Sequence, residues 1–206
     1  MNLRTLFSNP PAEFRSAPFW SWNDKLEPEE IAWQVRQMKE HGMGGFFMHS
    51  RDGLETEYLG EAWMNCVKTA VEAAREEGMG AWLYDEDRWP SGAAGGLVTK
   101  QGEAFQLKVL TLELSLTLPQ EQTLAVFRGK VSGNKLVSLR DGDGPLQEGE
   151  KYLLFRQELA EPSPWFNGQA PSDNLNPESV RAFIASTYEA YLQQVGEDFG
   201  TTVPGI

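Results

Sequence analysis

Three short apolar runs alternate with two amphipathic segments in the first half of the chain. The runs cover residues 17–22, 44–48 and 81–84, and the segments between them carry apolar residues at helical spacing. A helix between two strands carries the chain back to the same end of the sheet, so that the strands pair in parallel. The pattern predicts a parallel α/β sheet, in either a barrel or a doubly wound arrangement.

Local signals indicate where the two helices begin and end. Pro28 suits the first turn of a helix, and Glu29 and Glu30 favour the positive end of its dipole. Gly42 is placed to end this helix, and Gly78 to end the second one, which we expect over residues 61–77.

The pattern changes over residues 104–162. Residues 105–114 alternate between apolar and polar with a period of two, and further strand-like runs follow at 123–127, 135–139 and 152–155. Turn signals at 133–134 and 141–144 separate these runs. We predict a small antiparallel β insertion, with a ligand-binding role as an open alternative to solvent-facing decoration.

Helical periodicity returns over residues 163–206. Asn176, Pro177 and Glu178 together form a strong helix start, and Gly196 ends that helix. Residues 203–206 read as the approach to a further strand. Since a closed parallel barrel needs about eight strands, we expect part of a (β/α)8 TIM-type barrel: its first units in 1–103, the insertion in 104–162, and a return to the barrel in 163–206.

Composition excludes several classes of function. With 206 residues, 40% hydrophobic and 23% charged, the chain is globular, and its net charge of −12 argues against nucleic acid or an anionic membrane as partner. The single cysteine, Cys66, excludes an internal disulfide. No apolar run is long enough for a signal peptide or a membrane span, so we expect a cytoplasmic protein.

The carboxyl ends of the three predicted strands carry the candidate functional residues. Such ends meet at one edge of a parallel sheet, where α/β proteins place their sites. Indole faces suit the C–H faces of a sugar, and polar groups suit its hydroxyls, so the composition of this edge points to carbohydrate. The residues are Trp20, Trp22, Asn23, His49, Arg51, Asp85, Glu86, Asp87, Arg88 and Trp89.

Hydrolysis of a glycosidic bond uses two carboxyl groups, one protonated and one ionised. Asp85, Glu86 and Asp87 supply candidates, and crowding of like charges raises the pKa of a carboxyl group. Adjacent strand residues point to opposite sides, so the three cannot all face one site. The alternative is structural: one carboxylate caps the following loop and another pairs with Arg88.

Four ordered motifs resemble glycoside hydrolase family 106, the α-L-rhamnosidases. They are PFWSWN at 18–23, GGFFMHSRDGL at 44–54, YDEDRWPSG at 84–92, and PWFNG at 164–168 with LNPE at 175–178. The resemblance implies a barrel that hydrolyses a terminal α-L-rhamnoside with inversion. It implies Glu86 as a catalytic carboxylate, which we expect to act as general acid. It also implies a sugar subsite formed by Trp20, Asn23, His49, Arg51, Asp87 and Trp89, to which the strand-end pattern adds Trp22.

The resemblance further implies calcium, for which Asp85 or Asp87 offers suitable hard oxygen ligands. In that family the second carboxylate follows the position where residues 204–206 end, so we expect this chain to be inactive alone. We also expect it to associate with the remainder of a barrel or with itself. Two other classes stay open: a carbohydrate-binding or interaction module without hydrolysis, and a barrel hydrolase of another sugar, such as a galactoside or uronide.

Overall fold

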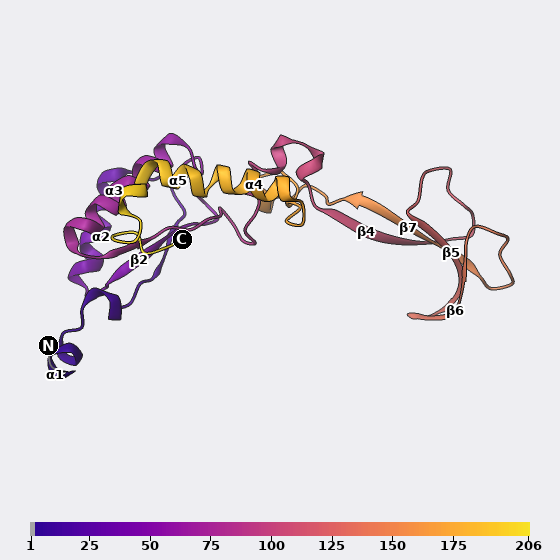
Figure 1. Ribbon diagram of the computed structural model, residues 1–206, viewed down its shortest axis with the longest axis horizontal. Coiled ribbons are helices and arrows are strands. Elements are labelled where there is room, and N and C mark those ends of the chain that lie inside the picture. The colour runs from indigo at the N-terminus through magenta and orange to yellow at the C-terminus, as the bar shows by residue number, and fades with distance from the viewer. Residues whose placement is uncertain (1–2) are drawn as a thin grey trace. The chain divides into compact units, whose positions relative to one another are not determined.

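The computed structural model describes residues 3–206, which form two compact units (Figure 1). The first unit contains the described residues up to Phe105 together with Pro162–Ile206, and the second contains Gln106–Glu161. The first unit has helices α1 (Leu3–Ser8), α2 (Pro28–Glu40), α3 (Glu61–Glu77), α4 (Pro177–Ser186) and α5 (Tyr188–Val195), and strands β1 (Phe19–Trp22), β2 (Gly45–Ser50) and β3 (Gly80–Trp82). The second has strands β4 (Lys108–Ser115), β5 (Ala125–Ser132), β6 (Lys135–Asp141) and β7 (Lys151–Leu159).

A parallel sheet of order β1-β2-β3 organises the first unit. In its register Trp22 lies opposite Ser50, and Phe47 lies opposite Trp82. α2 connects β1 to β2, and α3 connects β2 to β3, so each parallel pair has its crossover helix. The parallel pairing predicted from the alternation of strands and helices is therefore present.

The start of α2 and the end of α3 lie where the sequence signals predicted them. Pro28 opens α2, whose buried side is formed by Ile31 and Val35. Gly78 ends α3 in the left-handed conformation at φ 62°, where its N–H donates to the carbonyl of Ala74. A residue with a Cβ atom adopts this conformation only at a cost, and glycine adopts it freely.

The core of the first unit lies between this sheet and α3. Trp63 on α3 is fully buried, with its ring 4.9 Å from that of Trp22 and 5.0 Å from that of Tyr58. Its indole N–H donates to the hydroxyl of Tyr191 on α5, at 3.3 Å. One tryptophan thus joins β1, α3 and α5.

The expectation of a partial (β/α)8 TIM-type barrel is wrong. The parallel sheet has three strands, and after β3 the chain enters an irregular loop and then the separate antiparallel unit rather than a further helix and parallel strand. Near residue 206, the N–H groups of Ala81 and Leu83 donate to the carbonyls of Thr202 and Gly205, but this segment makes only an isolated bridge. The strand–helix pattern determines parallel pairing and does not determine whether a sheet closes into a barrel.

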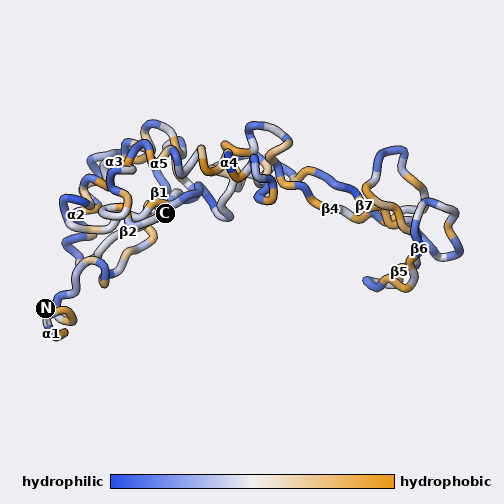
Figure 2. The backbone as a smooth tube through the Cα atoms, in the orientation of Figure 1, coloured by the Kyte–Doolittle hydropathy of each residue, from blue (hydrophilic) through white to orange (hydrophobic). Residues whose placement is uncertain are grey.

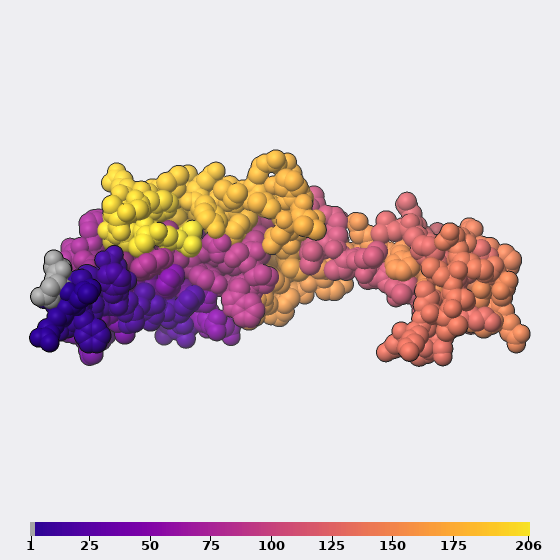
Figure 3. Space-filling view, turned by 60° about the horizontal axis from the view of Figure 1, so that its bottom comes forward, coloured from indigo at the N-terminus to yellow at the C-terminus, as the bar shows by residue number. Residues whose placement is uncertain are grey.

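Two helices occupy the segment where one was expected. Asn176 caps α4 by accepting a hydrogen bond from the N–H of Glu178 at 3.0 Å. The helical path is interrupted at Thr187, whose hydroxyl donates to the carbonyl of Phe183 at 2.7 Å. α5 then packs against α3, and Figure 3 shows the yellow C-terminal region lying against the N-terminal part of this unit.

The second unit is an antiparallel sheet of order β4-β7-β5-β6. The alternation of 105–114 predicted a strand, and β4 forms there with exposed leucines at positions 110, 112 and 114. Figure 2 shows segments of hydrophobic residues around β5 and β7 beside loops of hydrophilic residues. Leu153 and Leu154 on β7 are buried within this unit.

An ion pair in the second unit predicts a local dependence of stability on pH. Arg140 Nε donates to Glu150 Oε1 at 3.0 Å, and the N–H of Gln147 donates to Glu150 Oε2 at 2.7 Å. The Arg140 hydrogen bond, with that of Gln147, lowers the pKa of Glu150 from 4.5 to about 2. A depressed folded pKa stabilises the fold above pH 4.5, and this contribution is lost as pH falls toward 2.

We therefore expect hydrogen exchange in peptides of β6 and β7 to accelerate between pH 4.5 and 2, after correction for intrinsic rates. Glu150→Gln is expected to remove most of this acceleration, and Glu148→Gln, at an exposed neighbouring position, to leave it. The same acceleration in both variants would contradict the role of the pair.

Within residues 3–206, no helix combines the length and the hydrophobicity that crossing a membrane requires.

Candidate functional site

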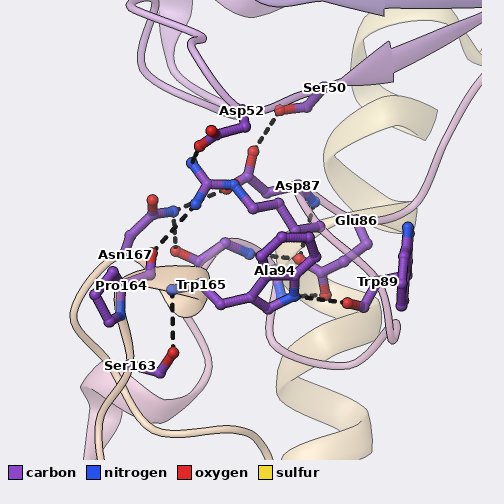
Figure 4. A network of polar contacts seen from close by, with 12 residues as sticks. Ser50, Asp52, Glu86, Asp87, Trp89, Ala94, Ser163, Pro164, Trp165 and Asn167 are labelled. Atoms are coloured by element: carbon purple, nitrogen blue, oxygen red, sulfur yellow. Dashed lines mark hydrogen bonds and ion pairs between the residues drawn. The ribbon is translucent and has the colours of Figure 1, made fainter.

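A small cavity of about 100 Å³ in the first unit brings together residues from three separate segments. The segments are the end of β2, the loop after β3, and the turn that begins at Ser163. Its lining residues are His49, Ser50, Arg51, Asp52, Asp87, Arg88, Trp89 and Trp165. Figure 4 shows most of the polar contacts around it.

Asp87 is the buried carboxylate of this cavity, at 3% exposure. Its Oδ1 accepts a hydrogen bond from the hydroxyl of Ser50, and its Oδ2 accepts one from Nδ2 of Asn167 at 2.8 Å. The two bonds tie the loop after β3 to the end of β2 and to the turn of Asn167 (Figure 4). Asp87 is thereby held in one orientation.

Arg88 lies in the middle of the site and is held on several sides. Its Nη2 lies 3.5 Å from Asp52 Oδ1, and its Nη1 donates to the carbonyl of Pro164 at 3.1 Å. Its guanidinium carbon lies 5.8 Å from the centroid of the Trp165 ring, within the range of a cation–π contact. Nε has no hydrogen-bond partner, and Asp87 Oδ2 lies 3.8 Å from it, beyond hydrogen-bond distance.

Two exposed indoles form the outer wall. Trp89 is 56% exposed and Trp165 is 39% exposed, and their rings meet edge to face with centroids 5.6 Å apart. The indole N–H of Trp165 donates to the carbonyl of Trp89 at 2.8 Å, which fixes one relative to the other. Large exposed apolar rings that are held in place are typical of binding surfaces.

His49 forms part of the inner wall and is 4% exposed. Its ring packs edge to face on Tyr84 at 4.2 Å and on Phe19 at 5.4 Å. Burial lowers the pKa of His49, the nearby charge of Arg51 lowers it further, and Asp87 opposes the change. The imidazole is therefore neutral at pH 7, and a neutral imidazole offers one donor and one acceptor nitrogen.

Glu86 is enclosed by backbone rather than exposed to the cavity. It is 1% exposed, and its carboxylate accepts five backbone N–H bonds. Oε1 accepts from Asp87 at 2.9 Å and from Gly95 at 2.6 Å; Oε2 accepts from residues 92, 93 and 94 at 3.0, 2.8 and 2.8 Å. Burial raises the pKa of Glu86, and the amide hydrogen bonds oppose this rise.

The glycines of residues 92–96 make this enclosure possible. Gly92 has φ 132°, and a Cβ atom there would lie 2.2 Å from Asn174 Oδ1. Ala94 and Gly95 have φ 50° and 63°, in the left-handed region. Successive amides that alternate between backbone conformations form a concave nest for an anion, and here the side chain of Glu86 is that anion.

The carboxylate of Asp85 has other partners than those of Glu86 and Asp87. Its Oδ1 accepts from the hydroxyl of Ser91 at 2.8 Å, and its Oδ2 accepts from the hydroxyl of Tyr188 at 2.9 Å. Burial, with the bond to Asp85, raises the pKa of Tyr188 to about 12. The expectation that the three neighbouring carboxylates cannot share one site agrees with these contacts.

The two carboxylates suited to calcium, those of Asp85 and Asp87, are held apart by separate hydrogen bonds. The carboxylates of Asp85 and Asp87 accept from different partners, and both oxygens of each already accept a hydrogen bond. Among residues 3–206 no group of three His, Cys, Asp or Glu side chains could hold a metal ion. The calcium implied by the resemblance of the motifs stays a prediction.

The structure brings together four of the residues predicted for the sugar subsite: His49, Arg51, Asp87 and Trp89. The other three do not line the cavity. Trp22 is 2% exposed within the core, Trp20 is half-buried with its N–H donating to Gln34 Oε1 at 2.9 Å, and Asn23 is exposed. A position at the end of a strand does not show which face of the sheet a side chain lies on, because residues of one strand alternate between the two faces. It therefore could not distinguish the residues that line the cavity from those that do not.

The sugar subsite predicted from the sequence omitted four residues that line the cavity. Ser50 and Asp52 are neighbours of predicted residues, and Arg88 was considered as the partner of a carboxylate. Trp165 lies 76 positions after Trp89, and its indole N–H donates to the carbonyl of that residue. The only signal for Trp165 in the sequence is its motif, PWFNG.

Comparison with known proteins gives little beyond this geometry. No protein-family model and no curated protein matches the chain. Among solved structures, the chain is similar to a rhamnosidase from Novosphingobium sp. PP1Y, with 16% sequence identity and a TM-score of 0.44. The match covers 64% of this chain and 15% of that rhamnosidase. Membership of glycoside hydrolase family 106 is not established by these comparisons.

Proposed function

We propose that the cavity beside Trp89 binds a terminal sugar of a glycan, as part of a glycoside hydrolase of the α-L-rhamnosidase type. The observation that carries the proposal is the convergence of two exposed indoles with a neutral imidazole, a guanidinium and a carboxylate on one cavity. The sugar type comes from the resemblance of the sequence motifs.

The chemistry of this wall suits a pyranose sugar. An indole face packs against the C–H groups of a pyranose ring, which gains from burial of apolar area. Asp87 and Arg51 offer an acceptor and a donor for hydroxyl groups, and His49 offers one of each. A cavity of about 100 Å³ is below the roughly 300–1,000 Å³ of pockets for drug-sized ligands, which favours a single sugar unit.

A second candidate is sugar binding without hydrolysis. Five amide donors occupy the carboxylate of Glu86, whereas a general acid must present its proton to the leaving oxygen. Release of 4-nitrophenol from 4-nitrophenyl α-L-rhamnoside tests the first candidate. Turnover that purifies with the chain supports hydrolysis and contradicts the binding module; rhamnose binding without turnover agrees with the binding module and with the inactivity expected of the chain alone.

Trp89→Ala is expected to weaken binding of L-rhamnose by about ten-fold, equivalent to about 1.4 kcal/mol. The physical reason is loss of the apolar ring against which the sugar packs. Isothermal titration calorimetry measures the affinity directly. Trp33→Ala is the matched control, because Trp33 is 51% exposed and lies on α2, outside the cavity.

Equal affinities of Trp89→Ala and Trp33→Ala for rhamnose would show that rhamnose does not bind in this cavity. Absence of rhamnose binding by the unmodified chain would remove the proposed function altogether.

A further inference from the structure

We propose that the apolar face of the antiparallel sheet in the second unit packs against the same face of a second copy of the chain. This inference is independent of the proposed sugar site, whose cavity belongs to the first unit. The register of β4, β7, β5 and β6 places a set of apolar side chains on one side of the sheet, here called the apolar face. Its principal members are Leu110, Leu112, Leu114, Phe127, Leu139 and Phe155.

The pairing of the strands shows that these side chains share one side. Leu112 on β4 lies opposite Phe155 on β7, and the rings of Phe155 and Phe127 meet edge to face at 5.7 Å. Gly129, two positions after Phe127 on β5, lies opposite Leu139 on β6. Residues directly opposite on paired strands point to the same face. The apolar face therefore extends across all four strands.

The opposite face of the sheet is polar. Arg156 on β7 lies 3.2 Å from Glu113 on β4, and Arg140 on β6 donates to Glu150 just before β7. The three strand residues alternate along their strands with members of the apolar face. The ion pairs occupy the side that suits solvent, so the apolar face is the side that a second layer would cover.

The apolar face is open within one copy of the chain. Leu110, Leu112 and Leu139 are each at least half exposed, although they lie within strands. Leu153, opposite Leu114 on the central strand β7, is buried. Strand neighbours therefore cover the middle of the face and leave its β4 and β6 sides uncovered. Apolar surface that extends over a whole sheet marks an interaction surface.

The distribution of charge allows a second copy to bind here. With a net charge of −12, two copies of the chain repel one another on average. On the apolar face, however, the register places charged residues only at strand ends: Lys108 at the start of β4, Lys151 at the start of β7 and Asp141 at the end of β6. Two such faces can meet without burying like negative charges between them.

The composition of the face also favours a second copy over a different protein. Interfaces between identical subunits are more apolar than other interfaces and resemble a hydrophobic core. Binding sites for a different protein concentrate their energy in Trp, Tyr and Arg. The principal members of the apolar face are leucine and phenylalanine, and all seven tryptophans of the chain lie in the first unit.

The face is large enough for a specific interface. Its strands have seven to nine residues, so at the usual spacing of strands and residues the face covers roughly 500 Å² in projection. Two faces together bury roughly 1,000 Å², the least that a specific interface needs. A face that packs on itself does so about a two-fold axis, which closes the assembly as a dimer. The product is a sandwich of two four-stranded sheets.

Sedimentation velocity of the full chain at a series of micromolar concentrations tests the proposal. We expect a species of twice the 23.1 kDa mass of the chain. Leu112→Lys is expected to weaken the dimer at least about 100-fold, because the two-fold axis places two lysines in the apolar interface. Leu139→Lys tests the β6 side of the face in the same way. Leu175→Lys is the matched control, at an exposed leucine of the first unit, and should leave the dimer intact.

Circular dichroism shows whether the variants fold. Leu112 and Leu139 are exposed in one copy, so we expect both lysine variants to keep the spectrum of the unmodified chain. If one of them does not fold, the other decides. A chain that stays monomeric at every concentration would overturn the proposal. A dimer that persists in folded lysine variants of the face would overturn it as well, because the copies would then associate through another surface.

Discussion

Replacing Glu86 by glutamine is expected to lower the free energy of unfolding of the first unit by at least about 2 kcal/mol. A glutamine amide keeps one acceptor oxygen, but its NH₂ group faces the N–H groups that donated to the second carboxylate oxygen. Oε2 accepts from residues 92, 93 and 94, and Oε1 from residues 87 and 95. Each buried donor without an acceptor costs about 1–3 kcal/mol.

Tryptophan fluorescence during urea denaturation measures this effect, because all seven tryptophans lie in the first unit. Asp85→Asn is the matched control, since Asp85 accepts from two hydroxyl groups that can turn to other partners. We expect this control to cost less than about 1 kcal/mol. If Glu86→Gln is as stable as the unmodified chain, the enclosure of Glu86 by the 92–95 loop does not hold in solution.

The same variant bears on the role predicted for Glu86 from the family resemblance. A general acid that contacts substrate would lose its activity on conversion to glutamine while the fold kept its stability. A carboxylate that holds a loop loses stability first. If the unmodified chain turns over substrate, comparing turnover and unfolding of one protein sample separates the two roles.

Trp63→Ala is expected to destabilise the first unit by about 3–5 kcal/mol, the usual cost of truncating a buried aromatic side chain. Trp63 is fully buried, its ring lies 4.9 Å from that of Trp22, and it donates to Tyr191 at 3.3 Å. Truncation leaves a cavity where β1, α3 and α5 meet. Trp63→Phe retains most of the volume and is expected to cost less.

Thermal unfolding followed by far-ultraviolet circular dichroism measures this change without relying on the deleted fluorophore. Trp33→Ala serves as control here as well, and we expect it to cost less than about 1 kcal/mol because its ring is 51% exposed. Equal stability of the two alanine variants would contradict the placement of Trp63 at the centre of this core.

The residues predicted for the sugar subsite lie on one cavity where their positions were set by local structure. His49 lies at the end of β2, and Asp87 and Trp89 lie in the loop after β3, so neighbouring parallel strands bring them to one edge. Trp20 and Trp22 were assigned to the same edge, yet they pack in the core against Trp63 and Phe46. Alternation along a strand determines that neighbouring residues face opposite sides of the sheet. Burial by α2 and α3 determines which side chains belong to the core.

The sequence by itself determined the parallel pairing of β1, β2 and β3, the limits of α2 and α3, and the alternating strand at β4, because these depend on periodicity and on residues close in the chain. Only the tertiary structure decided that the sheet stays open with three strands, that Trp165 reaches Trp89, and that the amides of residues 92–95 enclose Glu86. Each of these depends on contacts that close only after the elements have packed. Spacing along the chain cannot show such contacts.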